Sequence, residues 1–275
     1  MTVPADHIAT VRVWRWRAGE SPTQIDDALV HEQPLEIRVR GRAVAVTMRT
    51  PGHDGELAAG FLLTEGVIRE PGDVFAIEPC HRAPDEDGQV VNVFLTEGVA
   101  MDYERLTRHV FASSSCGVCG KATIDAVHQH FPPVDGEHFT VKASLLADLP
   151  KRMRVEQAVF QRTGGLHAAA LFDAAGRLLV LREDVGRHNA VDKVIGHAFE
   201  RGWLPLHRHV LLVSGRASFE IMQKALAARV AVVAAVSAPS SLAVNFAEQS
   251  GQTLAAFVRE GRVNIYADRD RVELT

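Results

Sequence analysis

Two short apolar segments, each followed by a small polar turn and a helical pattern, constrain the fold more than any other feature. Residues 209–213 and 230–236 are rich in Val, Leu and Ala, with no polar alternation. Continuous apolar runs of this length are typical of strands that are covered on both faces. Polar turns at 214–218 and 237–241 follow them and open helices. A strand, turn and helix repeated in this way predicts a three-layer α/β domain over a mostly parallel sheet.

The rest of the chain divides into a strand-rich first half and an α/β second half. We place the boundary near residues 132–137, so that residues 1–135 form a strand-rich part and 136–275 an α/β domain; the two could also form one domain. Further strands are expected at 11–16, 35–40, 43–48, 90–95, 168–172, 178–181, 254–258 and 263–266. Helices are expected at 54–63, 122–130, 190–200, 217–228 and from 241 through 248.

Composition excludes several classes of protein. With 47% hydrophobic and 23% charged residues the chain is typical of a globular protein, and a net charge of −4 gives no indication of nucleic-acid binding. No apolar run reaches the roughly 18 residues of a membrane helix, and residues 1–20 do not resemble a signal peptide. We therefore expect a cytoplasmic protein. Its 3 cysteines do not suggest a disulfide framework.

The most informative segment is Cys116-Gly117-Val118-Cys119, preceded by three serines and followed by Gly120 and Lys121. The helical pattern after it places both thiols at or just before a helix N-terminus. The helix dipole, backbone N–H groups and the Lys121 charge would favour the thiolate there, which is the species that attacks a disulfide or a persulfide. The segment therefore favours sulfur or redox chemistry at a reactive thiol.

Two other interpretations of this cysteine pair stay open. The thiols could be buried structural residues, although the polar approach and the glycines favour exposure. They could also form half of a zinc site, with Cys80 and His81 supplying further ligands. Spacing alone does not separate sulfur carriage from dithiol oxidation.

The two polar turns of the second half predict an anion-binding edge. Ligands of open α/β sheets bind outside the carboxyl ends of the strands, where helix N-termini present free N–H groups. Arg216 lies in the first turn, and Phe257, Arg259 and Arg262 could stack on and pair with a nucleotide. The alternative is that these serines are ordinary helix caps.

Several motifs together resemble those of the FdhD/NarQ family. The resemblance covers most of the chain. It is carried by residues 50–62, the pair Cys116 and Cys119, and segments 163–167, 182–193 and 214–216.

The resemblance implies a fold similar to the cytidine deaminases, without their zinc signature. It implies a sulfurtransferase that accepts persulfide sulfur from a cysteine desulfurase and passes it to molybdenum in bis(molybdopterin guanine dinucleotide), for formate dehydrogenase. That cofactor would be a transferred ligand, with no permanently bound cofactor or metal. Cys116 would carry the sulfur and Cys119 assist its release. Cofactor contacts would come from Arg216, Phe257, Val258, Arg259, Glu260, Gly261 and Arg262.

A rival from another class is a zinc-stabilised protein that holds the cofactor or docks on the dehydrogenase without covalent chemistry. The oligomeric state stays open, with a homodimer as one option.

Overall fold

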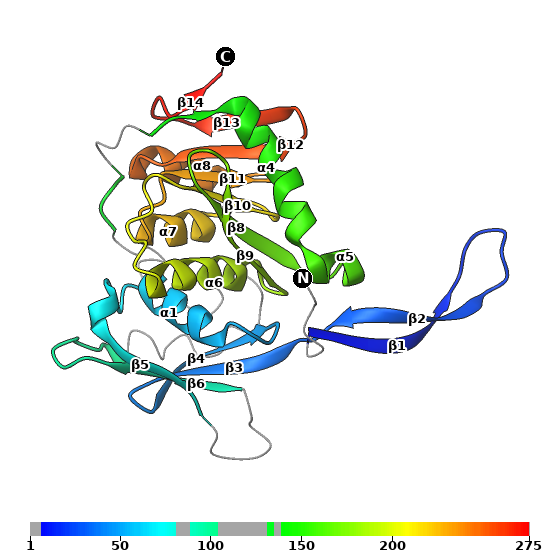
Figure 1. Ribbon diagram of the computed structural model, residues 1–275, viewed down its shortest axis with the longest axis horizontal. Coiled ribbons are helices and arrows are strands. Elements are labelled where there is room, and N and C mark those ends of the chain that lie inside the picture. Colours follow the sequence, from blue (N-terminus) through cyan, green and yellow to red (C-terminus); the bar gives the residue numbers. More distant parts are fainter. Residues whose placement is uncertain (1–6, 81–88, 104–130, 135–138, 275) are drawn as a thin grey trace.

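The computed structural model describes residues 7–80, 89–103, 131–134 and 139–274. These residues form a layered body from which one long hairpin projects (Figure 1). Within the described ranges, no helix is long and apolar enough to cross a membrane.

A six-stranded sheet forms the centre of the body. Its strands are β8 (His167–Phe172), β9 (Leu178–Asp184), β10 (Val210–Val213), β11 (Val232–Ala235), β12 (Thr253–Arg259) and β13 (Arg262–Ala267). The order is β13-β12-β11-β10-β8-β9. β10, β11 and β12 are parallel, and the other pairings are antiparallel. The sheet is less parallel than predicted, because β8–β9 and β12–β13 are hairpins, whose strands must run in opposite directions, and because β8 also runs antiparallel to β10.

Helices cover both faces of this sheet, which gives the predicted three-layer α/β/α core. The helices are α6 (Arg187–Glu200), α7 (Phe219–Ala227) and α8 (Ser241–Ser250) on one face, and α4 (Ala143–Glu156) on the other, followed by the short α5 (Ala158–Thr163). Successive strand residues point to opposite faces. In β10, Leu211 and Val213 therefore join the core under α6 and α7, whereas Val210 and Leu212 join the core under α4.

A second sheet lies below the first, with α6 and one further helix between them (Figure 1). Its strands are β3 (Gln33–Val39), β4 (Arg42–Arg49), β5 (Val74–Pro79) and β6 (Val90–Leu95), in the order β4-β3-β6-β5. The helix is α1 (Asp54–Thr64), which packs against α6 on its other side. One continuous core therefore contains residues of both sheets, from Leu35 to Ala267. The division near residue 135 stays a prediction.

Smaller elements complete the fold. The projecting arm is the hairpin of β1 (Ile8–Arg15) and β2 (Thr23–Val30), a single 3-10 turn η2 (Pro71–Asp73) precedes β5, and β7 (Val141–Lys142) pairs with β14 (Val272–Glu273). α4 was not predicted, because Pro150 lies in its interior and proline normally breaks a helix. The helix predicted at 122–130 lies outside the described residues.

Candidate functional site

The motifs of the second half meet at one edge of the central sheet. The parallel strands β10 and β11 end there, since Val213 pairs with Ala235, and β12, in which Ala255 pairs with Ala234, continues past it to Arg259. β8 is antiparallel to β10, and its first residue, His167, therefore lies at the same edge. β9 ends there as well, which brings the start of α6 alongside. Segments far apart in sequence thus form one surface.

The two predicted turns lie side by side at this edge. Ser237 N donates to Gly215 O at 3.4 Å, and Ala217 N donates to Ala238 O at 3.2 Å. Ser218 and Ser240 also cap α7 and α8, accepting from the backbone N–H groups of the third helical residue in each case. The serines are therefore ordinary caps, and the turns are also neighbours on the edge where ligands of α/β sheets bind.

The predicted cofactor-binding residues extend from this edge along the β12–β13 hairpin. Phe257 is half-buried and adopts a positive φ of 50°, and its N–H donates to Ser237 O at 3.1 Å. That bond ties the hairpin to the second turn. Val258 is fully buried in the core, so it offers no accessible surface at this edge. The remaining predicted residues, Arg216, Arg259, Glu260, Gly261 and Arg262, are exposed.

Four ionisable side chains at this edge were not assigned a role from sequence. Gly215 lies between His167 and the side chain of Arg187; a Cβ there would be 3.5 Å from His167 Nδ1 and 3.7 Å from Arg187 Cδ. His188 Nε2 lies 2.7 Å from Glu220 Oε2, with both side chains largely buried. Arg187 Nε is buried without a hydrogen-bond partner among the described atoms. The sequence signal was the Gly-Arg-His run at the start of α6, but the partners of these side chains come from other elements.

The positive charge at this edge of the sheet comes from Arg187 and not from His167. Burial lowers the pKa of His167, and the nearby charges of Arg187 and His188 lower it further, against the opposing effect of Asp184. His167 is therefore neutral near neutral pH, and the positive charge beside it is the guanidinium of Arg187. The N-terminus of α6 has no capping side chain, and its free N–H groups add to a positive local field. The arrangement suits an anionic group.

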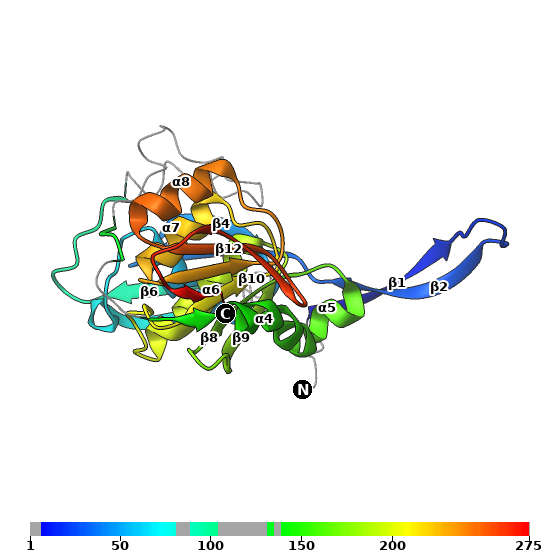
Figure 2. The same ribbon diagram turned by 90° about the horizontal axis from the view of Figure 1, so that it is seen from above.

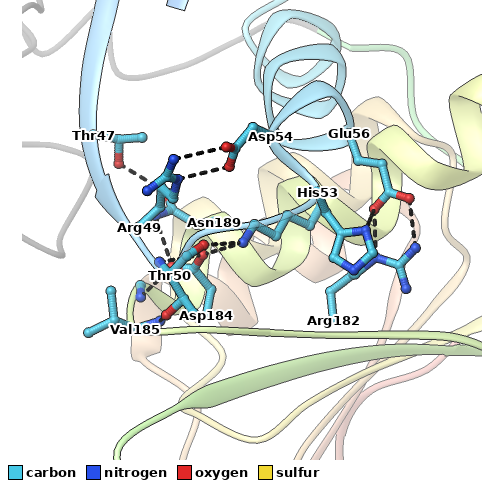
Figure 3. A network of polar contacts seen from close by, with 12 residues as sticks. Thr47, Arg49, Thr50, His53, Asp54, Glu56, Arg182, Asp184, Val185 and Asn189 are labelled. Carbon is cyan, nitrogen blue, oxygen red and sulfur yellow. Dashed lines mark hydrogen bonds and ion pairs between the residues drawn. The ribbon is translucent and has the colours of Figure 1, made fainter. Parts of the chain in front are cut away.

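A buried network holds the start of α6 in place (Figure 3). Lys193 Nζ lies 2.7 Å from Asp184 Oδ2 and donates to Thr50 O at 2.8 Å. Asp184 also accepts from Gly186 N, and from the side chain of Asn189 at 3.1 Å. Since a buried charge is tolerated only when paired and hydrogen-bonded, this network fixes the segment that carries Arg187 and His188.

A second ionic cluster joins α1 to β9 and α6, and part of it is visible in Figure 3. Arg182 donates to both carboxylate oxygens of Glu56 at 2.6 Å, and His197 Nδ1 lies 2.9 Å from Glu56 Oε1. Burial alone would raise the pKa of Glu56, but the hydrogen bonds from Arg182, His53 and His197 outweigh it and hold the pKa well below its ordinary value. Arg49 and Asp54 form a further bidentate pair beside it.

A family model matches nearly all of the structure described above. Residues 30–273 match the model of the FdhD/NarQ family, which is more than half of the chain. The chain belongs to the FdhD/NarQ family. The expectation drawn from its motifs is confirmed.

Curated relatives of this FdhD/NarQ chain are similar over almost their whole length. A protein of Mycolicibacterium paratuberculosis named sulfur carrier protein FdhD is 54% identical over 95% of this chain and 97% of its own. A protein of Streptomyces coelicolor with the same name is 53% identical over 96% and 95%. A crystal structure of a candidate formate dehydrogenase accessory protein from Desulfotalea psychrophila has a TM-score of 0.74 at 23% identity. It covers 97% of this chain and 100% of that one, which confirms the fold.

The two cysteines predicted to be catalytic in this FdhD/NarQ chain, Cys116 and Cys119, lie outside the described residues. Cys80 is half-buried and directly follows β5. In the described parts of the chain, no group of three His, Cys, Asp or Glu side chains is arranged to hold a metal ion.

Proposed function

We propose that this protein is a sulfur carrier that serves the maturation of a formate dehydrogenase. The observation that carries the proposal is the name sulfur carrier protein FdhD on relatives 53% and 54% identical over nearly the whole chain. The description of the structural neighbour as a candidate formate dehydrogenase accessory protein agrees with it. A cytoplasmic location follows as a prediction, because the proposed partners act before the dehydrogenase is complete.

The proposed chemistry is nucleophilic sulfur transfer through a covalent intermediate. The Cys116 thiolate attacks the outer sulfur of a persulfide on a cysteine desulfurase. A new S–S bond forms on Cys116, the S–S bond of the donor breaks, and the donor cysteine leaves as a thiolate. Cys119 assists release of the carried sulfur, either by attack on the persulfide or by stabilising its charge. In the first case, attack by the Cys119 thiolate on the Cys116 sulfur would break the persulfide S–S bond, form a Cys116–Cys119 disulfide and release the outer sulfur as hydrosulfide, which the molybdenum of the cofactor would accept. A thiol reductant would then restore the two thiols.

The positive edge of the central sheet is the proposed site for the transferred cofactor, bis(molybdopterin guanine dinucleotide). Its phosphates require cations and free N–H groups, which Arg216, Arg187 and the α6 N-terminus offer on one surface. Phe257 and the exposed arginines of the β12–β13 turn would contact a guanine and its phosphates. The contact set proposed here is Arg187, Arg216, Phe257, Arg259, Glu260, Gly261 and Arg262; Val258, also expected from the sequence, is buried beneath them.

A mass spectrum after incubation with a desulfurase and cysteine tests the sulfur-carrier proposal. We expect the wild type to gain one sulfur atom, and Cys116→Ala to gain none while remaining folded. Cys80→Ala is the matched control and should be loaded like the wild type. Loading of Cys116→Ala at the wild-type level would contradict the assignment. Full dehydrogenase maturation by a folded Cys116→Ala protein would contradict the function itself.

The rival function, a zinc-stabilised docking protein, makes a different prediction. A zinc site would require Cys116 and Cys119, with further ligands such as Cys80, which lies at the end of β5. Metal analysis of the purified protein separates the two proposals. One tightly held zinc ion per chain would favour the rival, whereas metal-free protein that accepts sulfur would favour the carrier.

A further inference from the structure

Glu220 is a carboxylate at the positive edge of the central sheet, and the proposed function gives it no role. It lies in the first turn of α7, directly after the Ser218 cap. α7 lies beside α6 on one face of the sheet (Figures 1 and 2), and Glu220 contacts the first turn of α6 through His188. A carboxylate repels phosphates, so it is out of place on a surface that suits them. Its position there calls for a partner of another kind.

The described part of the chain satisfies only one oxygen of this carboxylate. Oε2 lies 2.7 Å from Nε2 of His188, close enough for an ion pair, although the angle between the two groups is too poor for a hydrogen bond. Oε1 is buried and accepts no hydrogen bond from any described atom. Nε of Arg187, the residue before His188, is likewise buried without an acceptor. Buried polar atoms are almost always paired, so two unpaired ones in neighbouring side chains indicate that a ligand supplies their partners.

A ligand at this edge can reach the carboxylate. The Glu220 side chain is 14% accessible, and the last torsion of a glutamate is broad, so a small rotation presents an oxygen at the accessible part. The turn before α7 leaves room, because Gly215 has no side chain and lies against the Arg187 side chain. The anion-binding groups and the unpaired carboxylate oxygen therefore belong to one site.

An unpaired carboxylate selects a ligand that brings N–H donors, and nucleobases differ in this respect. Guanine has two adjacent donors, N1–H and the 2-amino group, whereas the corresponding edge of adenine places its amino group next to an acceptor nitrogen. A carboxylate binds two adjacent donors as it binds the donors of an arginine, and it is repelled by an acceptor. The same 2-amino-4-oxopyrimidine edge is present in pterins. The site therefore combines a cation for phosphates with an acceptor for this edge.

We propose that the Glu220 carboxylate reads the 2-amino-4-oxopyrimidine edge of the ligand and so sets the preference of this site for guanine. The inference rests on the proposed function, since it takes a guanine nucleotide of the transferred cofactor as the ligand. Glu220 accepts from N1–H and the 2-amino group, His188 holds the carboxylate in place, and Arg187 binds the phosphates. The pterin of the same cofactor is the other source of this edge.

Nucleotide analogues test the contact by calorimetry at a fixed salt concentration. Inosine diphosphate lacks only the 2-amino group, so the wild type should bind GDP about tenfold or more tightly than inosine diphosphate. In Glu220→Gln the amide oxygen faces His188, and the amide N–H group takes the place of the unpaired carboxylate oxygen. This variant should lose the preference for GDP. It should also bind xanthosine diphosphate about tenfold or more tightly than the wild type does, because the 2-oxo group of xanthine accepts from the new donor.

Glu248→Gln is the matched control, because it makes the same change on an exposed residue of α8. It should keep the wild-type order of affinities. Neopterin, a pterin without phosphate, distinguishes the two sources of the edge: if Glu220→Gln loses neopterin binding but keeps the wild-type order of the nucleotides, the edge is read in the pterin. Circular dichroism checks that the variants fold, and the comparison of GDP with inosine diphosphate needs no variant at all.

Several results would overturn the proposal. One is a wild type that binds none of these ligands, or that binds GDP and inosine diphosphate equally and no neopterin. Another is a Glu220→Gln protein that keeps both the wild-type order of the nucleotides and the binding of neopterin. A preference that is lost in Glu260→Gln instead would assign the base to the β12–β13 turn. Sulfur loading of Cys116 decides the proposed function separately, because that step involves only thiols.

Discussion

Replacing Gly60 by alanine should destabilise the protein, although alanine is the better helix former. α1 and α6 pack so closely that a Cβ on Gly60 would overlap the backbone oxygen of Asp192 and lie 2.6 Å from its carbonyl carbon. Real Cβ contacts essentially never fall below 3.0 Å, so the two close-packed helices must separate by about 1 Å. A Cβ on Gly196 would meet the backbone of Glu56 in the same way. Backbone atoms cannot rotate away as a side chain can, so the overlap can be relieved only if α1 and α6 move apart.

The expected change in the free energy of unfolding is the balance of two opposing effects. Overpacking a core costs about 1–3 kcal/mol and occasionally more, whereas replacing glycine inside a helix gains up to about 1 kcal/mol. For Gly60→Ala we expect a net loss of about 2 kcal/mol, which lowers the melting temperature by roughly 4–8 °C for a chain of this size. Gly196→Ala should behave in the same way.

Gly55→Ala in the same helix is the matched control. Its Cβ would meet only side-chain atoms, Ile77 Cγ2 at 3.5 Å and Glu200 Oε1 at 3.6 Å, which is ordinary packing distance. It should be neutral or slightly stabilising. Urea and thermal unfolding of the three variants measure the difference. Equal stability of Gly60→Ala and Gly55→Ala would refute the close approach of the two helices.

Three further predictions concern charge. The wild type should bind GDP more tightly than ADP in calorimetry, and Arg216→Ala should weaken GDP binding roughly 10- to 100-fold; no binding, or equal binding of ADP, would contradict the cofactor site. Glu56→Gln should cost about 2 kcal/mol near neutral pH in urea unfolding. The pKa of Glu56 in the folded state lies below its ordinary 4.5, so this stabilisation is present above pH 4.5 and is lost as pH falls further. The difference in unfolding free energy between wild type and Glu56→Gln should therefore shrink in acid. A difference that stays constant with pH would show that Glu56 does not titrate as inferred. The alkylation rate of Cys116 should have a midpoint below the ordinary thiol pKa of about 8.5, and a midpoint at or above it would remove the proposed helix N-terminus.

The sequence by itself determined the parts of the protein that depend on local chemistry. The apolar runs at β10 and β11 predicted buried strands, and the serines after them predicted helix starts, because both signals act within a few residues. The shared edge of the two turns followed from the rule that parallel strands end together, and the structure confirms it. Motif resemblance predicted the family in the same way, since a motif is read from adjacent residues.

Only the tertiary structure decided which distant groups meet. Glu56 and Arg182 are 126 residues apart, and His188 finds its partner Glu220 on another helix. No periodicity encodes such pairs, because they depend on how α1, α6 and β9 pack. α4 escaped prediction for a related reason: Pro150 is locally a helix breaker, yet burial of Leu146 and Leu149 against the sheet outweighs its cost. Local signals therefore set the elements and most of their ends, whereas packing brought His167, Arg187 and Gly215 to one surface.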